Sequence, residues 1–98
     1  MPLFVLIGRD GPDGIALRKR HRDAHLANLQ PLVDAGRVRF AGPIRTADGN
    51  PCGSVVVFEA TDLAAAQALA EADPYAVEGV FASIEVRETL QVFPKDAT

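Results

Sequence analysis

The sequence predicts an α+β fold in which four strands and two helices follow one another in the order βαββαβ. The first observation behind this prediction is that four segments have the residue pattern of strands. The second is that two intervening segments repeat apolar residues at helical spacing. The third is that the 98 residues, of which 48% are hydrophobic and 23% charged, have the size and balance of one globular domain, residues 1–98.

The first strand and the first helix are predicted in residues 3–8 and 15–35. Residues 3–8 form a continuous apolar run, which is typical of a strand covered on both faces. Turn-forming residues follow at 10–14. The helical segment then carries apolar side chains at positions i, i+3 and i+7 and on the adjacent row, namely Leu26, Leu29, Val33 and Leu32.

Two residues bear on where this helix ends. Gly36 is suited to end it, because glycine readily adopts the left-handed conformation that follows many helices. Pro31 lies inside the predicted helix, lacks an amide hydrogen and crowds the carbonyl of Ala27. We therefore expect a kink or an early break at Pro31.

The second and third strands are predicted in residues 37–42 and 54–59. Residues 37–42 alternate between apolar and charged side chains, as in a strand with one solvated face. Residues 54–59 are apolar on both faces. The segment between them, 43–53, is rich in turn residues and is predicted to be a long hairpin connection.

The second helix and the fourth strand are predicted in residues 63–70 and 80–93. Thr61 or Asp62 can cap this helix at its start. The pair Asp73-Pro74 ends it, because the residue before a proline disfavours the helical conformation. Residues 80–93 alternate and are predicted to form a long strand with one apolar face.

This element order, with right-handed crossovers, is that of a ferredoxin-like fold, an antiparallel four-stranded sheet with two helices on one face. In its spatial strand order the first and third strands are central. These are the two strands that are apolar on both faces here, whereas the second and fourth alternate. The helices leave the other face of the sheet uncovered and apolar, so we expect a homodimer in which a second copy covers it.

Charge and composition argue against several classes of function. The net charge of −3, from 10 basic and 13 acidic residues, gives no electrostatic reason to expect a nucleic-acid partner. No apolar run approaches the ~18–20 residues of a membrane span, and the N-terminus has no basic leader. Cys52 is the only cysteine, and we expect a cytoplasmic protein. With only two histidines and one cysteine, we expect no metal site. The sequence contains no glycine-rich phosphate-binding loop, so we also expect no nucleotide-type cofactor.

Three polar residues share the inward side of the first helix. Arg18, Arg22 and His25 fall in the same sector as Leu29 and Leu32 when residues are placed ~100° apart. One interpretation is that this end of the helix lines a cleft. The other is that the arginines extend over the helix end and that His25 is a boundary residue with its hydrogen bonds satisfied.

Asp73 is the natural partner for this stripe. It follows the second helix, where the helix dipole disfavours a carboxylate, so an interaction elsewhere would explain it. Beside His25, the Asp73 carboxylate would orient the imidazole for acid–base catalysis. The alternative is ordinary turn chemistry in an Asp-Pro pair. Ser54, at the start of a central strand, could likewise offer its hydroxyl to a ligand or simply be solvated.

Several motifs along the chain form one pattern: Arg22-Asp23-Ala24-His25-Leu26-Ala27-Asn28-Leu29, Gly36, Ala41-Gly42-Pro43, Gly53-Ser54 and Asp73-Pro74-Tyr75. This pattern resembles the YCII-related family over nearly the whole chain. Its most specific parts are Arg-x-x-His-Leu in the first helix and Asp-Pro-Tyr after the second. The resemblance implies a dimeric α+β barrel of two ferredoxin-like halves. It also implies a pocket whose histidine and aspartate form an acid–base pair, here His25 and Asp73, with Ser54 as a pocket hydroxyl.

The function that we expect is that of a small cofactor-independent enzyme. His25, oriented by Asp73, would move a proton on a small, anionic or enolisable substrate in an elimination, isomerisation or lyase-type step. Arg22 and Arg18 would hold the negative charge of the substrate, and Tyr75 would line the pocket or donate a hydrogen bond. The alternative is a non-catalytic small-molecule-binding or accessory module that uses the same cleft.

Overall fold

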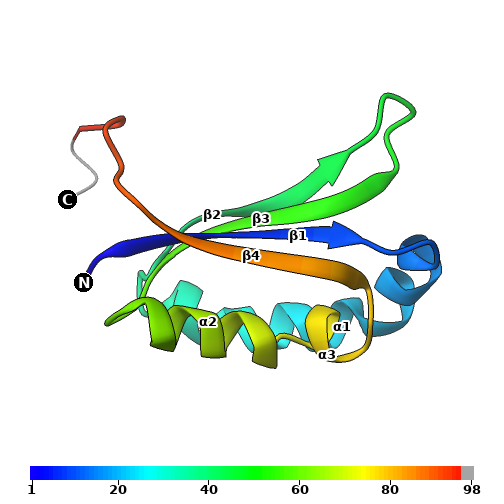
Figure 1. Cartoon of the computed structure of the whole chain (residues 1–98), viewed down its shortest axis with the longest axis horizontal. Coiled ribbons are helices and arrows are strands. Elements are labelled where there is room, and N and C mark those ends of the chain that lie inside the picture. The colour runs from blue at the N-terminus through cyan, green and yellow to red at the C-terminus, as the bar shows by residue number, and fades with distance from the viewer. Residues whose placement is uncertain (96–98) are drawn as a thin grey trace.

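The computed structural model describes residues 1–95 of the chain. Its elements in order are β1 (Leu3–Asp10), α1 (Gly14–Asp34), β2 (Val38–Arg45), β3 (Pro51–Glu59), α2 (Leu63–Ala72), α3 (Pro74–Val77) and β4 (Phe81–Thr89). The sheet is antiparallel with the strand order β2-β3-β1-β4, and the helices lie on one face of it (Figure 1). The predicted α+β, ferredoxin-like fold is therefore confirmed, with β1 and β3 in the centre.

The core lies between the sheet and the helices. Phe4 and Leu6 of β1 are paired in register with Phe58 and Val56 of β3, and all four side chains are buried. α2 packs against this cluster through its buried alanines, Ala66 and Ala70. Alanine side chains are short, so the helix backbone can approach the sheet closely.

The connection between β2 and β3 is shorter than predicted, because both strands extend to leave only residues 46–50 between them. Pro43 lies within the edge strand β2, and Pro51 is the first residue of β3. Strand edges and strand starts tolerate proline, so neither residue marks a loop here. Gly49, with φ +88°, closes the turn in the conformation that glycine adopts most easily.

α1 continues past Pro31 to Asp34, so, of the kink or early break expected there, the early break is wrong. A proline removes one hydrogen bond of the helix, the one to the carbonyl of Ala27, while the bonds on either side remain. The predicted helix end at Gly36 is correct. Gly36 has φ +71°, and the amides of Gly36 and Arg37 donate to carbonyls of the last turn at 3.0 and 2.9 Å.

The inward face of α1 differs from the predicted apolar stripe. Leu29 is half-buried, but Leu26 and Val33 are 43% and 48% exposed. The buried positions of the helix are instead Gly14, Arg18 and His25. The side chains of α1 that are buried most deeply are therefore polar. Buried polar side chains need hydrogen-bond or ion-pair partners.

β4 ends at Thr89 and does not continue to residue 93 as predicted. Thr89 pairs with Leu3, the first residue of β1, so the pairing between the two strands ends there. Leu90 and Val92 are accordingly 81% and 60% exposed. None of the helices in residues 1–95 is both long enough and apolar enough to span a membrane.

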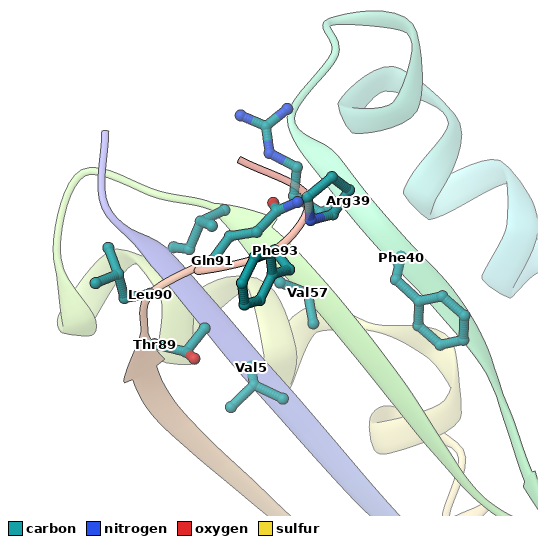
Figure 2. Close-up of a pocket in the computed structure, with 10 residues that line it drawn as sticks. Val5, Arg39, Phe40, Val57, Thr89, Leu90, Gln91 and Phe93 are labelled. Atoms are coloured by element: carbon teal, nitrogen blue, oxygen red, sulfur yellow. The ribbon is translucent and has the colours of Figure 1, made fainter. Parts of the chain in front are cut away.

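The face of the sheet opposite the helices carries apolar side chains of the central strands, and the segment after β4 rises on this side (Figure 1). A groove of about 400 Å³ lies there between the sheet and that segment. Val5, Val57 and Phe40 border the groove from the sheet, and Leu90 and Phe93 border it from the C-terminal segment (Figure 2). Figure 2 also shows Arg39 and Gln91 at its border.

Candidate active site

Residues of α1, β2, β3 and α3 line a cavity of about 240 Å³ on the helix-covered side of the sheet. Its lining contains five of the six predicted site residues, which are Arg18, Arg22, His25, Ser54 and Tyr75. The sixth, Asp73, is 2% exposed and contacts the His25 ring. The fold thus gathers in one place residues that are far apart in the chain, such as Arg18 and Tyr75, which are separated by 57 positions.

His25 and Asp73 form a buried pair. The Nδ1 atom of His25 lies 2.8 Å from Oδ1 and 3.0 Å from Oδ2 of Asp73. Because carboxylate oxygens only accept hydrogen bonds, Nδ1 is the donor, and the neutral imidazole carries its proton there. The ring lines the cavity, and no described residue hydrogen bonds to its other nitrogen, Nε2. The lone pair of Nε2 is therefore available to a ligand in the cavity.

Asp73 ends α2, as predicted, and has a second role that the sequence did not indicate. A third, unpredicted helix, α3, begins at Pro74, so Asp73 both ends α2 and caps the start of α3. Its Oδ1 accepts the amide hydrogen of Tyr75 at 2.8 Å, and its Oδ2 accepts from the amide group of Asn28 at 3.4 Å. The carboxylate lies at the C-terminal end of α2, as expected, and its contacts with Tyr75, Asn28 and His25 are the interactions that offset the unfavourable dipole there.

Tyr75 holds the imidazole in its orientation. The two rings are stacked, with their centroids 3.9 Å apart and an angle of 3° between their planes. Phe81 packs edge-on against the Tyr75 ring, at a centroid distance of 5.7 Å. Burial raises the pKa of the Tyr75 phenol above its ordinary value. The hydroxyl therefore stays protonated and donates towards the carbonyl oxygen of Arg18 at 3.5 Å.

Arg18 is held by a residue that sequence reasoning missed. Asp10, at the end of β1, accepts from Nε of Arg18 at 2.7 Å and from Nη2 at 2.9 Å. Nη2 also donates to Oγ of Ser54 at 3.0 Å. The Asp10 and Arg18 side chains are only 6% and 10% exposed. The positive charge of Arg18 is thus already compensated inside the protein.

Arg22 is placed differently from Arg18. It lies at the exposed rim of the cavity, and no carboxylate of residues 1–95 comes within ion-pair distance of it. An uncompensated guanidinium at a cavity mouth attracts anions. Of the two arginines on this face, Arg22 is the one whose charge is available to a ligand.

Asn28 is the second residue that was missed, and the sequence held a signal for it. It lies three positions after His25, so the two share a helix face. Asp10 had no such signal. It sits among turn residues, and its contact with Arg18 depends on how the chain reverses between β1 and α1.

Comparison with known proteins places the chain in a family. The YCII-related domain matches residues 2–90. Protein YciI of Escherichia coli O6:H1 is 41% identical over 97 residues, covering 93% of this chain and 99% of that protein. Protein YciI of Shigella flexneri matches with the same identity and coverage.

One solved structure is similar in both fold and sequence. It is that of 5-chloro-2-hydroxyhydroquinone dehydrochlorinase (TftG) from Burkholderia phenoliruptrix, in complex with 2,5-dihydroxybenzoquinone. It matches with a TM-score of 0.80 and 29% identity, covering 91% of this chain and 94% of the other. From the domain match and the 41% identity, we conclude that this chain belongs to the YCII-related domain family.

Proposed function

We propose that the protein is a small enzyme in which His25 transfers a proton to or from a compact substrate without a cofactor. The observation that carries this proposal is the contact of His25 Nδ1 with Asp73 at 2.8 Å, at the wall of the cavity that His25 lines. A base needs a free lone pair and a stable protonated form. Nε2 provides the free lone pair, and the negative charge of Asp73 stabilises the protonated imidazole.

This arrangement suits an elimination, an isomerisation or a related lyase-type step. In an elimination, Nε2 takes a proton from the substrate, the electron pair left behind forms a double bond, and the leaving group departs with its bonding pair. In an isomerisation, the proton returns at another atom. The related structure TftG bears the name of a dehydrochlorinase, and loss of hydrogen chloride is an elimination. That name supports a reaction of this class here.

The cavity restricts the size and the charge of the substrate. Its volume of about 240 Å³ lies below the ~300–1,000 Å³ of most drug-sized ligand sites, which favours a compact molecule. Arg22 at the rim favours a negatively charged one. We therefore propose a small, anionic or enolisable metabolite as the substrate.

Turnover of 5-chloro-2-hydroxyhydroquinone, followed as chloride release, tests the proposal. His25→Asn should lower kcat at least ~100-fold, the usual contribution of a general acid–base residue, and should leave binding of 2,5-dihydroxybenzoquinone nearly unchanged. His21→Asn is the matched control, since His21 lies outside the cavity lining. If the wild-type protein binds the quinone but releases no chloride, the protein is a binding module for such compounds. If His25→Asn retains the wild-type rate, the assignment of His25 is wrong.

We also propose that a second copy of the chain covers the open face of the sheet. The groove there exposes Phe40, Leu90 and Phe93 by 58%, 81% and 74%. An isologous contact would place the same apolar surface of both copies together. Light scattering should give the mass of a dimer, and Phe40→Asp should give a monomer. Val77→Asp is the control, because Val77 is 65% exposed on α3, on the helix side. A wild-type monomer at micromolar concentration would contradict this proposal.

A further inference from the structure

Gly8 lies where a glycine is unfavourable, inside the central strand β1. It is paired with Ser54 of β3 on one side and with Ile84 of β4 on the other. A glycine within a strand weakens the strand and often marks a place where another group approaches the backbone closely. The φ angle of Gly8 lies outside the left-handed region, so its backbone conformation does not require glycine. The missing side chain therefore needs another explanation.

The aromatic ring of Phe81 occupies the space beside Gly8. A Cβ atom at Gly8 would lie 2.7 Å from Cδ2, Cε1 and Cε2 of Phe81. Because Cδ2 and Cε1 are on opposite sides of the ring, this position lies over the ring face. Packed carbon atoms keep about 3.5–4.0 Å apart, so a larger residue leaves no room for the ring. Phe81 is 7% exposed and packs on the backbone of β1.

A β-bulge in β4 turns Phe81 towards the helices. Asp10 pairs with Phe81, although the residue before Asp10 pairs with Ser83, so Ala82 is an extra residue in β4. Side chains three positions apart in a regular strand face opposite sides of the sheet. Phe81 and Ile84 nevertheless pack in the same cluster, because the bulge shifts the alternation by one residue.

Phe81 supports the ring that stacks on His25. Phe81, Tyr75 and Val80 form a second, smaller core, apart from the main core of the sheet and α2. Tyr75 contacts Phe81 edge-on at a centroid distance of 5.7 Å and stacks on the His25 ring at 3.9 Å. Tyr75 belongs to α3, which has only four residues. So short a helix is not stable by itself, so the position of Tyr75 depends on the packing around it.

We propose that Phe81, packed on Gly8, is a positioning residue for His25 and acts through Tyr75. This inference rests on the proposed function. Asp73 holds the imidazole at a single atom, Nδ1, and a contact at one atom leaves the ring free to tilt. The stacked Tyr75 ring removes this freedom, and Phe81 fixes Tyr75. The tilt of the imidazole sets the direction of the Nε2 lone pair, and proton transfer requires that this lone pair is aligned with the substrate.

Nuclear magnetic resonance of the carbon-bound ring protons of His25 measures the stacking directly. Protons over the face of an aromatic ring are shielded, so stacking on Tyr75 places these signals upfield. The chain has two histidines, and His25→Asn identifies the signals of His25. Phe81→Leu should move them downfield. Phe4→Leu is the matched control, because Phe4 is 0% exposed but lies in the main core, and it should leave the signals in place.

Turnover of 5-chloro-2-hydroxyhydroquinone gives a second readout. Phe81→Leu should lower kcat about 10- to 100-fold, the scale of a small misplacement of a reacting group. KM should change little, because Phe81 does not line the cavity. Phe4→Leu should keep both constants near those of the wild type.

Gly8→Ala tests the same contact without deleting the ring. The added methyl group should displace Phe81 and move the His25 signals downfield. In the Phe81→Leu background, Gly8→Ala should have a smaller effect, because the ring that it displaces is gone. Gly11→Ala is the control, since a Cβ atom there would make an ordinary contact at 3.6 Å. If Phe81→Leu does not fold, the His25 signals in Gly8→Ala decide the question.

The outcomes distinguish this inference from the proposed function. Unchanged His25 signals in Phe81→Leu would overturn the inference, even where His25→Asn abolishes turnover. Equal shifts in Phe81→Leu and Phe4→Leu would also refute it, because the effect would then be a general loss of packing. Shifted signals with a wild-type kcat would contradict the role of Phe81 in the reaction. If the wild-type protein releases no chloride, the proposed catalysis is refuted, whereas the signals still show whether Phe81 fixes the His25 ring, because that readout needs no substrate.

Discussion

Replacing Asp73 by alanine removes two structural interactions at once. The carboxylate caps α3 through the amide of Tyr75 at 2.8 Å, and it accepts the Nδ1 proton of His25 at the same distance. Both contacts are buried, with Asp73 2% exposed and His25 9% exposed. In Asp73→Ala, the cap is lost and Nδ1 keeps its proton without an acceptor.

The two losses can be added to give the expected destabilisation. Loss of a helix cap costs about 0.5–2 kcal/mol, and a buried donor left without a partner costs a further ~1–3 kcal/mol. The free energy of unfolding should therefore fall by about 1.5–5 kcal/mol. For a domain of this size each kcal/mol corresponds to ~4–8 °C, so Tm should fall by at least ~6 °C.

Asp62→Ala is the matched control for this measurement. Asp62 caps α2 by accepting the amide hydrogen of Ala65 at 2.8 Å, but it is exposed and has no histidine partner. Urea unfolding of both variants, followed by circular dichroism, gives the cost of the cap alone and of the cap with the His25 contact. Tyr75 fluorescence reports on the site separately, since the chain has one tyrosine and no tryptophan. Equal destabilisation by the two substitutions would refute the reasoning, because the His25 contact would then contribute nothing.

Three further predictions follow from the same contacts. Asp73→Asn keeps an oxygen that can accept from both Tyr75 and His25, so the same urea experiment should give a smaller loss than Asp73→Ala; a larger loss would contradict this. Because burial raises the pKa of Tyr75 above 10.0, the ultraviolet titration of this single tyrosine should have its midpoint above that pH. Its contribution to stability should be complete below pH 10 and should diminish as the pH rises through the folded-state pKa, since the unfolded chain loses the proton first; a midpoint at or below 10 would be inconsistent with burial. Gly14→Ala forces Asp10 away from Arg18 and should cost about 3–5 kcal/mol, as for a broken buried ion pair. Gly11→Ala, where a Cβ atom would meet only an ordinary contact at 3.6 Å, should cost much less, and similar losses in both would argue against the role of Asp10.

The strand order could be predicted because its signal is local. A strand with neighbours on both sides and layers on both faces excludes polar side chains, and residues 3–8 and 54–59 show this exclusion. The end of α1 at Gly36 was predictable for a similar reason, since the left-handed conformation is a property of one residue. Pro31 and Pro43 misled because a proline removes a single hydrogen bond, and the surrounding structure decides whether that loss is tolerated.

The site was predictable only in part. His25 and Asp73 could be named from their motifs and Asp73 was placed correctly at the end of the second helix, but its second role as the cap of α3 was missed, because this short helix after Pro74 was not predicted. Leu26 and Val33 had the spacing of buried residues and are exposed, whereas Arg18 is buried. Helical spacing predicts which residues share a face, and the neighbouring layer decides how much of that face is covered.

By itself, the sequence determined the element order, the central strands and the helix face on which the polar residues gather. These follow from the regular spacing of side chains along the backbone, which each segment carries within itself. Only the tertiary structure decided that Asp10 holds Arg18, that Arg18 contacts Ser54 and that His25 meets Asp73 across 48 positions of sequence. Contacts of this kind depend on the packing of separate elements against one another, which no single segment encodes.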